Sequence, residues 1–377
     1  MIAVGNLFVL SWASLANALG RNASDIRSRD FSFRPASFRC KSQADMLRSR
    51  LAPLIEAFAD KRILVIGDLM LDEFLWGKVS RISPEAPVPV VEIVNEEFFP
   101  GGAANVARNL AEFTRHASVL GVTGDCAHAA KLKQLLTSEG VDVGPVQSHD
   151  CYQTVVKTRI IARQQQVVRI DREKRVALRP EHAAAALEKI AAMLPAIDAV
   201  IVEDYGKGLF DQKFAGAICD LANRAGKIIA VDPNPHNLLD WSHVTVIKPN
   251  RAEAFASAGR LPTEPVDPPT EDRDLLAVGQ FLSEKWNADN LLITLGEQGV
   301  MLFHRGEPPY HAPTRAREVF DVSGAGDTVI ALFTLALTTG ATPAEAAEIA
   351  NHASGVVVGK LGTATVTPAE LLASFDA

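Results

Sequence analysis

From Arg62 onward, short apolar runs rich in β-forming residues alternate with longer stretches rich in Ala and Leu. This alternation is expected when helices cover both faces of a mostly parallel sheet. The predicted strands are Ile63–Gly67, Ala117–Gly121, Ala199–Glu203, Lys227–Val231, Val244–Lys248 and Leu291–Leu295. The predicted helices are Ala103–Glu112, Ala127–Ser138, Glu181–Met193, Asp211–Arg224, Asp272–Lys285, Gly324–Thr338 and Pro343–Val357. The sequence therefore predicts an α/β fold with a doubly wound sheet.

Two segments depart from this order, Val88–Glu96 and Thr154–Asp171. Each has the composition of a strand with no helix beside it, and each partly alternates apolar with polar residues. Such alternation predicts a sheet with one solvated face, so we expect a small separate sheet built from residues of about 74–97 and 152–172. Ligands of α/β sheets bind outside the carboxyl ends of the strands, where such a sheet would form a lid. The alternative is a pair of extra edge strands in the main sheet.

The N-terminus differs in character from the rest of the chain. Residues 1–20 are apolar but lack the basic region that opens a secretory signal. An amphipathic stretch that begins at Met46 leads directly into the first predicted strand. We therefore expect residues 1–45 to be disordered or to precede the true start of translation, and residues 46–377 to form one domain.

Composition excludes several classes of protein. The chain is 47% hydrophobic and 22% charged, which is ordinary for a globular protein and argues against a protein with many membrane spans. Its net charge of -7 argues against a nucleic-acid partner, because binding to the phosphate backbone needs an excess of Lys and Arg. The 4 cysteines form no CxxC pair, so we expect neither zinc nor disulfides and a reducing cytoplasm. A GxxxxGK[ST] phosphate loop and an HExxH motif are both absent from the sequence.

The sharpest local signal is the run DVSGAGD, from Asp321 to Asp327, which precedes an apolar helical stretch. Glycines at a helix start let the backbone approach a ligand closely, and the free N–H groups there attract anions. The amides of Ala325 and Gly326 could therefore hold a phosphoryl group while Asp327 accepts a hydroxyl proton. The alternative is that Asp321 or Asp327 only caps the helix.

DVSGAGD resembles the C-terminal signature of the PfkB carbohydrate kinases of the ribokinase family, whose usual form is DTxGAGD. The resemblance implies a ribokinase-like fold in which Gly324, Ala325 and Gly326 form an anion hole and Asp327 is the catalytic base. Val322 stands where Thr is more common.

The run GGAANVA resembles the N-terminal signature of the same family, and it implies sugar contacts from Gly101, Gly102 and Asn105. Asp68 and Asp72 match the positions where similar kinases bind sugar hydroxyls, although Asp68 could be a plain turn residue.

Two more stretches match the family in order and spacing, NRAE as its NxxE motif and TLGEQG as its TLGxxG turn. The resemblance implies ATP and Mg²⁺ as cofactors, with Glu253 arranging the metal through water, and it leaves a need for a monovalent cation such as K⁺ open. Glu253 could instead be a solvated helix carboxylate and Gly296 a plain turn glycine. The residues assigned to the nucleotide are Asn250, Glu253, Thr294, Gly296, Glu297, Gly299 and Asn351. The resemblance covers nearly all of residues 61–370.

Three stretches, Gly67–Gly77, Arg81–Val90 and Ala162–Asp171, look specifically like heptose 7-phosphate kinases within this family. That resemblance implies transfer of the ATP γ-phosphate to the anomeric hydroxyl of D-glycero-D-manno-heptose 7-phosphate, in ADP-heptose and lipopolysaccharide core synthesis. It also implies a homodimer formed by crossed lids. The alternatives are a kinase for another sugar or nucleoside, and a non-catalytic sugar-binding regulator. Some similar kinases are fused to an adenylyltransferase; with no HxGH motif here, we expect that activity on another polypeptide.

A phosphorylated substrate needs a cationic clamp. Lys157, Arg159, Arg163 and Arg169 all have odd numbers, so an unbroken strand would present them on one face. We expect Arg163 and one neighbour to bind the 7-phosphate; the alternative is a solvated strand face. Lys207 and Asn234, which follow predicted strands, are further candidates for sugar or phosphate contacts.

Overall fold

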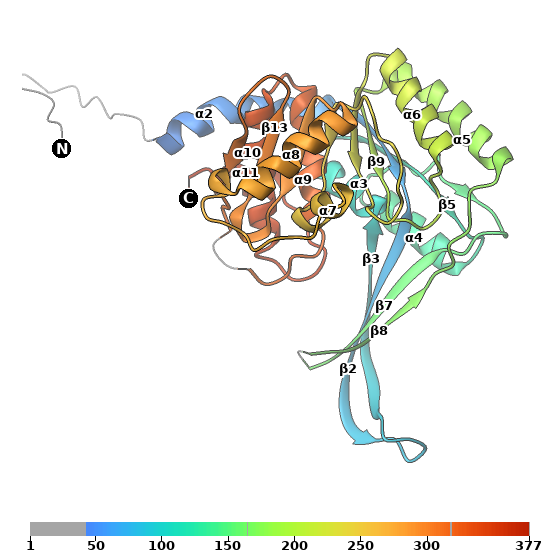
Figure 1. Cartoon of the computed structure of the whole chain (residues 1–377). Coiled ribbons are helices and arrows are strands. Elements are labelled where there is room, and N and C mark those ends of the chain that lie inside the picture. Colours follow the sequence, from blue (N-terminus) through green and yellow to red (C-terminus); the bar gives the residue numbers. More distant parts are fainter. Residues whose placement is uncertain (1–42, 164, 317–318, 377) are drawn as a thin grey trace, which may run out of the picture. The chain divides into compact units, whose positions relative to one another are not determined.

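The computed structural model describes residues 43–163, 165–316 and 319–376 (Figure 1). The expected N-terminal extension lies outside the described residues except for Gln43–Asp45, which open helix α2 (Gln43–Glu56). In the part of the chain that the structure describes, no helix is both long and apolar enough to cross a membrane.

An eight-stranded sheet forms the centre of the domain, in the order β14-β13-β12-β11-β10-β9-β1-β4. The strands from β12 to β4 run parallel, and β13 and β14 complete the sheet in antiparallel pairing. The parallel strands are β1 (Arg62–Gly67), β4 (His116–Leu120), β9 (Ala199–Glu203), β10 (Ile228–Asp232), β11 (Val246–Ile247) and β12 (Asn290–Thr294). The antiparallel strands are β13 (Val300–His304) and β14 (Tyr310–Ala312).

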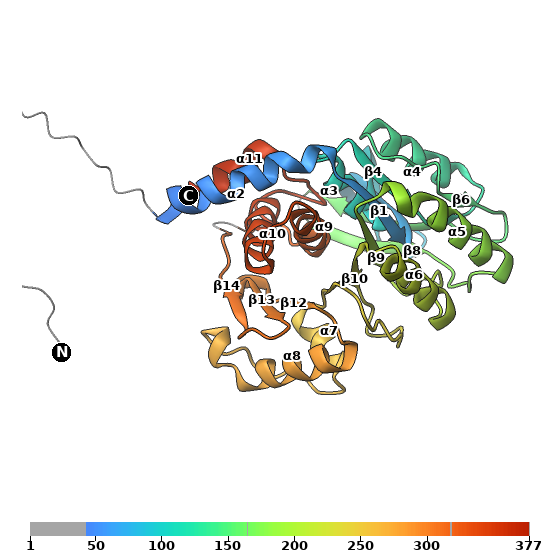
Figure 2. The same cartoon turned by 90° about the horizontal axis from the view of Figure 1, so that it is seen from above.

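Alternate residues of β1 show why helices cover both faces. Ile63 and Val65 belong to one buried apolar cluster, whereas Leu64 and Ile66 belong to a second. The first cluster includes side chains of α2, α3 (Ala103–Ala111), α4 (Ala127–Ser138), α9 (Ala325–Thr338), α10 (Pro343–Val357) and α11 (Pro368–Ser374). The second includes α5 (Pro180–Met193), α6 (Gln212–Arg224), α7 (Arg251–Ser257) and α8 (Arg273–Trp286). Figure 2 shows α9 and α10 on one side of β9 and β10 and α6 on the other, which confirms the predicted α/β class.

The predicted elements agree with the structure to within one or two residues at most boundaries. Among the predicted strands of the main sheet, the largest difference is Val244–Lys248, of which only Val246–Ile247 is a strand. The predicted strand Val88–Glu96 is longer in the structure, where it runs over Pro89–Gly102. The hairpin of β13 and β14 was not predicted. Short 3-10 helices occur at Ala57–Asp60, Leu194–Ala196, Pro269–Glu271 and Gly296–Gln298.

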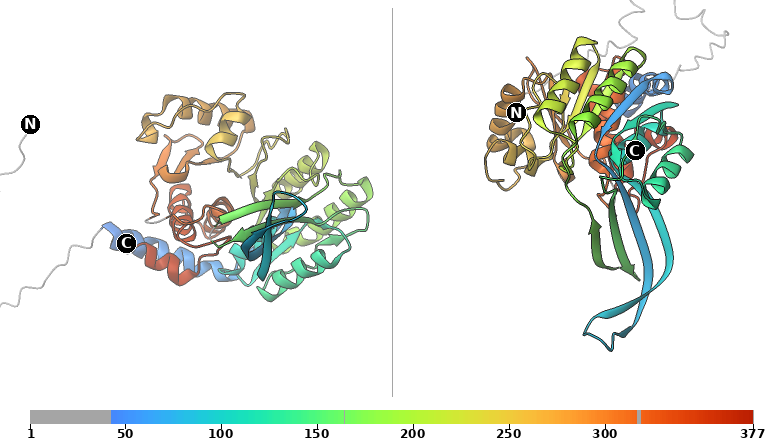
Figure 3. Two further views of the ribbon diagram at one scale, coloured as in Figure 1. Left: turned by 90° about the horizontal axis from the view of Figure 1, so that it is seen from below. Right: turned by 90° about the vertical axis from the view of Figure 1, so that its right-hand side faces the viewer.

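A separate four-stranded sheet has the order β3-β2-β7-β8, and it excludes the alternative of extra edge strands in the main sheet. Its strands are β2 (Leu69–Ile82), β3 (Pro89–Gly102), β7 (Val155–Ala162) and β8 (Gln165–Arg172). We refer to this sheet as the lid sheet. Figures 1 and 3 show its strands leaving the α/β body together, with β2 and β3 reaching further than β7 and β8. A third, two-stranded sheet pairs β5 (Val122–Thr123) with β6 (Gln147–Ser148).

The prediction of one unbroken strand over Thr154–Asp171 is wrong, because β7 and β8 form an antiparallel hairpin. The turn contains Arg163, whose φ of 59° lies in the left-handed region that favours glycine. Hairpins usually signal such a turn with Gly or Asn, and the stretch Arg163–Gln166 has neither. In the sequence, the apolar run Ile160–Ala162 is followed directly by the polar run Arg163–Gln166, and neither glycine nor asparagine marks the turn.

Candidate active site

Ionisable side chains end or follow four neighbouring parallel strands of the main sheet. Asp68 follows β1, Glu203 ends β9, Asp232 ends β10 and Lys248 follows β11. Parallel strands bring their carboxyl ends to one edge, so these residues meet at the edge where α/β proteins bind ligands. Asp68, Glu203 and Lys248 are 6%, 0% and 3% exposed, so this polar edge is withdrawn from solvent.

Asp327 lies at the centre of this edge, in the first turn of α9. Its Oδ2 accepts a hydrogen bond from Asn105 Nδ2 at 2.6 Å, and its Oδ1 accepts one from the Tyr205 hydroxyl at 2.8 Å. Burial raises the pKa of Asp327, and the two hydrogen bonds act in the opposite direction. The carboxylate is therefore held in a fixed orientation in surroundings that increase its basicity.

The first turn of α9 is open to an anion. The helix N-cap is Gly324, with a φ of 81° and no side-chain capping bond. Asp321 accepts hydrogen bonds from the amides of Ser323 and Gly362, so it shapes the loop before the helix. Neither Asp321 nor Asp327 caps the helix, which removes the capping alternative. The Ala325 amide, which was expected to bind the phosphoryl group, donates instead to the Val322 carbonyl at 3.2 Å. The Gly326 amide and the dipole of this turn can stabilise a phosphoryl group.

Three carboxyl groups cluster next to this turn. Oxygens of Glu203, Asp232 and Asp327 lie within 4.8 Å of one another. Burial and the neighbouring Asp232 raise the pKa of Glu203 well above its usual range, and burial raises that of Asp232 to about 7. Neither carboxylate oxygen of Glu203 has a hydrogen-bond partner. The cluster thus carries buried acceptors that a cation could satisfy.

Lys248 is the positive charge within this cluster. Its Nζ lies 2.8 Å from Asp232 Oδ2. Burial disfavours the ammonium, but the attraction of Asp232 and Glu203 raises the pKa of Lys248 overall. A Cβ placed on Gly326 would lie 3.3 Å from the Lys248 Nζ, so the ammonium also borders the first turn of α9.

Asp68 sits on the side of the site nearer the lid sheet. Its Oδ2 accepts hydrogen bonds from the amides of Tyr205 and Lys207, both at 3.0 Å. Burial raises the pKa of Asp68 despite these bonds. The carboxylate is therefore fixed by the loop that follows β9.

The root of the lid sheet meets the site at Asp72. Asp72 forms an ion pair with Arg159 across the neighbouring strands β2 and β7. A Cβ on Gly101 would collide with the Asp72 carboxylate, and Gly102 has a φ of 60° just before α3. These two glycines allow the lid strand to approach Asp72 and then turn into the helix that carries Asn105.

Two lysines gather beside the lid root. Burial and the nearby Lys207 lower the pKa of Lys157, and Lys207 Nζ pairs with Glu173 Oε2 at 2.7 Å. Arg169 pairs instead with its neighbour Asp171.

The structure separates Arg163 from these lysines. On β2, Asp72 pairs with Lys157, whereas Gly77 pairs with Ala162, the residue before Arg163. At about 3.3 Å per residue, the span from Asp72 to Gly77 is roughly 16 Å. Arg163 is therefore exposed at the far end of the hairpin, away from the site of its own chain.

A cavity of about 910 Å³ has Asp327 in its lining. Its size is in the range of pockets that hold small-molecule ligands and cofactors. Asn234 also borders it, as do Asp232, Lys248 and Gly326. All residues predicted to contact a nucleotide line this cavity: Asn250, Glu253, Thr294, Gly296, Glu297, Gly299 and Asn351.

The NxxE pair has a local structural role in addition to its place in the cavity. Asn250 caps α7 by accepting from the Glu253 amide at 2.9 Å, and Glu253 Oε2 accepts from the Asn250 amide at 2.7 Å. This capping box fixes Glu253 at the cavity wall. Asn351 donates to the carbonyl of Pro313 at 2.7 Å.

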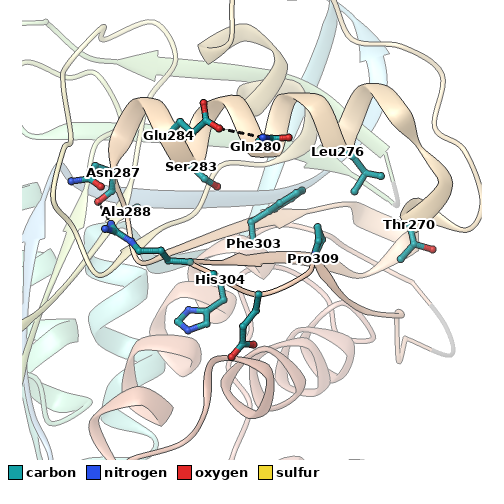
Figure 4. A pocket seen from close by; sticks show the side chains of 13 residues that line it. Thr270, Leu276, Gln280, Ser283, Glu284, Asn287, Ala288, Phe303, His304 and Pro309 are labelled. Atoms are coloured by element: carbon teal, nitrogen blue, oxygen red, sulfur yellow. Dashed lines mark hydrogen bonds between the residues drawn. The ribbon is translucent and has the colours of Figure 1, made fainter.

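A second cavity of about 570 Å³ lies beside α8 (Figure 4). Phe303 and Leu276 form part of its wall, and Glu284 and Arg305 contribute charged groups to its lining. None of the residues predicted from the sequence lines it. The predicted chemistry therefore belongs to the larger cavity and to the edge around Asp327.

Sequence reasoning missed four residues of the site, Glu203, Tyr205, Asp232 and Lys248. Three of them end or directly follow a strand, and Tyr205 lies two residues beyond β9. The available signal was an ionisable residue at the carboxyl end of successive apolar strands. Each was included within a strand prediction or passed over, because local sequence does not show that these ends converge.

Residues 60–370 of this chain match the sequence pattern of a protein family described as "pfkB family carbohydrate kinase". The chain belongs to the pfkB family. Its pfkB domain is similar to a protein named bifunctional protein HldE from Geotalea uraniireducens, with 40% identity over 330 residues. That match covers 88% of this chain and 66% of the relative.

A protein of the same name from Helicobacter pylori is 42% identical over 311 residues, covering 82% of this chain and 65% of the relative. The chain thus spans just under two thirds of the length of these relatives.

Solved pfkB-like structures share the fold. Arabidopsis thaliana ribokinase with ribose and ATP has a TM-score of 0.64 at 18% identity, covering 84% of this chain and 99% of its own. Escherichia coli phosphofructokinase-2 with potassium has a TM-score of 0.68 at 19% identity, covering 84% and 98%.

Proposed function

We propose that this pfkB-family chain uses ATP to phosphorylate D-glycero-D-manno-heptose 7-phosphate on its anomeric hydroxyl, giving the 1,7-bisphosphate on the route to ADP-heptose and lipopolysaccharide core. One observation carries the proposal. Asp327 lies between the nucleotide-sized cavity and the residues expected to bind sugar, and it is hydrogen-bonded to Asn105 of the GGAANVA motif. The choice of heptose rests on the heptose-kinase-like stretches and on relatives about 40% identical named bifunctional protein HldE.

The site supports in-line phosphoryl transfer. Asp327 accepts the proton of the sugar hydroxyl as that oxygen forms a bond to the γ-phosphorus. The bond between the γ-phosphorus and the bridging oxygen of ADP breaks, and ADP leaves with that electron pair. The first turn of α9, including the Gly326 amide, stabilises charge on the transferring oxygens.

Magnesium fits the buried acidic cluster. Hard divalent cations take oxygen ligands, and Glu203 offers two buried oxygens without hydrogen-bond partners. Glu203 and Asp232 would hold the ion, with Glu253 contacting it through water. Its charge, when bound, neutralises part of the triphosphate.

The 7-phosphate would bind to Lys157 and Lys207. The two ammonium groups lie close enough for Lys207 to lower the pKa of Lys157, and an anion between them would relieve that repulsion. Arg159 lies on the same strand but pairs with Asp72, so we assign it to orienting that carboxylate against the sugar. This pair of lysines replaces the clamp around Arg163 that the sequence had predicted.

We propose a homodimer formed through the lid sheet. Its edge strands, β3 and β8, carry exposed apolar side chains, among them Val94 at 60% and Val168 at 45%. Unpaired strand edges and exposed apolar residues favour association with another chain. The three described cysteines are free thiols, which fits the reducing cytoplasm where we place the reaction.

The substrate is tested by a coupled assay of ADP release, with and without K⁺. The panel consists of D-glycero-D-manno-heptose 7-phosphate, fructose 6-phosphate, ribose and adenosine. We expect kcat/KM to be at least about 10-fold higher for the heptose phosphate, the effect of one charged hydrogen bond in a binding site. A higher kcat/KM for any other member would overturn the substrate assignment, and ³¹P NMR of the product would show whether O1 carries the new phosphate.

A further inference from the structure

We propose that Lys248 is a further catalytic residue of this site, and that its ammonium leaves Asp232 to bind the transferring γ-phosphate of ATP. The proposal deepens the phosphotransferase function and depends on it only for the position of the phosphate. In the structure, Lys248 is a buried ion-pair partner of Asp232. The proposal makes it a direct ligand of the transferring phosphate as well.

The charge of the cavity is the first argument. The carboxylates of Asp232, Glu253 and Asp327 all line it, together with those of Asp204 and Glu297. A triphosphate is strongly anionic, so it cannot approach these groups unless positive charge stands between them. A basic side chain of the cavity wall can supply such charge close to the phosphates, in addition to the proposed magnesium ion.

The basic side chains among the described residues that line this cavity are Lys248 and Arg251. Arg251 is already committed elsewhere, because its Nη2 lies 2.8 Å from Asp272 Oδ2 and its guanidinium stacks on Phe255 at 4.9 Å. Lys248 is left as the basic side chain that faces the acidic cluster.

The position of the ammonium is the second argument. A Cβ on Gly326 would lie 3.3 Å from Nζ, so the ammonium borders the α9 turn that is built to receive an anion. The opposite neighbour is Asp232, at 2.8 Å. An anion held by the Gly326 amide would thus lie within reach of Lys248 after a rotation of its side-chain end.

The change of ion-pair partner has a small free-energy cost, because the Asp232 carboxylate and the Lys248 ammonium each gain a new partner. Asp232 lies beside Glu203 in the proposed magnesium site, so the cation can take over its charge. The ammonium then faces phosphoryl oxygens instead of a carboxylate. Charge develops on those oxygens as the γ-phosphoryl group transfers, and a nearby ammonium stabilises it.

Nucleotide binding without sugar tests this proposal independently of the heptose assignment. Calorimetry compares ATP with ADP, each with saturating Mg²⁺, for the full chain and for Lys248→Met. We expect Lys248→Met to weaken ATP binding by about 10-fold or more, as for one lost charged hydrogen bond, and ADP binding by less than about 3-fold. A purely structural role would weaken both nucleotides equally or neither, and either result would overturn the proposal.

Arg251→Met is the matched control, because it also removes a basic side chain, here a partly buried one, from the same cavity wall. We expect it to affect ATP and ADP alike. Thermal unfolding checks that each variant folds, and Lys248→Gln, which keeps a hydrogen-bond donor for Asp232, replaces Lys248→Met if that variant does not fold. The same ATP-against-ADP criterion applies to it.

A rescue experiment on turnover provides a second readout. In Lys248→Ala, added ethylammonium should restore part of kcat, measured with whichever panel substrate the wild-type chain turns over fastest. Equal concentrations of ethanol should not. If ethylammonium leaves kcat unchanged while the variant still binds the nucleotide, the ammonium does not contact the transferring group.

Discussion

Asp327 shows how single residues acquire their chemistry from distant parts of the chain. Its two hydrogen-bond donors come from α3 and from the loop after β9, and burial raises its pKa. The side chain has the identity expected from the DVSGAGD motif. Burial raises its pKa, and its orientation comes from Asn105 and Tyr205, which only the folded chain places beside it.

Substitutions of Asp327 and Tyr205 should distinguish the proposed proton acceptor from the residue that orients it. Asp327→Asn removes the proton acceptor without changing its size, so we expect kcat to fall about 10²–10⁴-fold with little change in either KM. Tyr205→Phe removes one hydrogen bond to the carboxylate and should lower kcat by roughly 10-fold. Steady-state kinetics on both variants measures this, and turnover of Asp327→Asn at the wild-type rate would eliminate the residue as the base.

At the scale of elements, the lid hairpin decides which basic side chains lie near Asp72 and the edge of the main sheet. Because β7 and β8 are antiparallel, Lys157 lies at the root of the hairpin opposite Asp171, and Arg163 lies at its turn. A continuous strand would instead have spread the basic residues along one face. The turn is therefore the reason why we assign the proposed phosphate site to Lys157 and not to Arg163.

Lys157→Met and Arg163→Ala test this difference directly. We expect Lys157→Met to raise the KM for heptose 7-phosphate by about 10-fold or more, because it removes a charged hydrogen bond to the 7-phosphate. Arg163→Ala, with a similar loss of charge at the turn, should change it by less than about 2-fold. A larger increase in KM for Arg163→Ala than for Lys157→Met would instead assign the binding of the 7-phosphate to Arg163.

At the scale of the whole molecule, the two largest sheets differ in how their faces and edges are covered. The eight-stranded sheet has a core on both faces and carries the proposed active site at one edge, whereas the four-stranded lid sheet leaves apolar residues exposed on both of its edge strands. Exposed apolar surface of this kind is stabilised when another chain covers it. We therefore expect the lid sheet to be the contact between copies of the chain.

Sedimentation velocity tests the dimer. The wild-type chain should sediment as a dimer at micromolar concentration, and a variant with Val94→Lys and Val168→Lys should shift towards monomer, because two buried charges would oppose the contact. Leu261→Lys is the control, since Leu261 is 88% exposed but lies outside the lid sheet. A wild-type monomer, or equal behaviour of the two variants, would contradict a lid-mediated dimer.

The α/β class followed from the sequence alone, because apolar residues that face the core recur with a period of 3.6 residues in a helix and 2 residues in a strand. It also determined the glycines and Asp327 of the α9 turn, since those requirements are local. It could not reveal the β7–β8 turn, where Arg163 adopts a left-handed φ without a glycine to announce it.

The residues that surround Asp327 are brought together by long-range packing. Glu203 and Asp232 are the last residues of two strands and Lys248 follows a third, and each has the local sequence of an ordinary strand end until parallel pairing brings the carboxyl ends to one edge. Contacts between strands depend on their order in the sheet, and that order is set by packing across the whole domain. Local sequence therefore specified the chemistry of single positions, and long-range packing brought those positions together at one site.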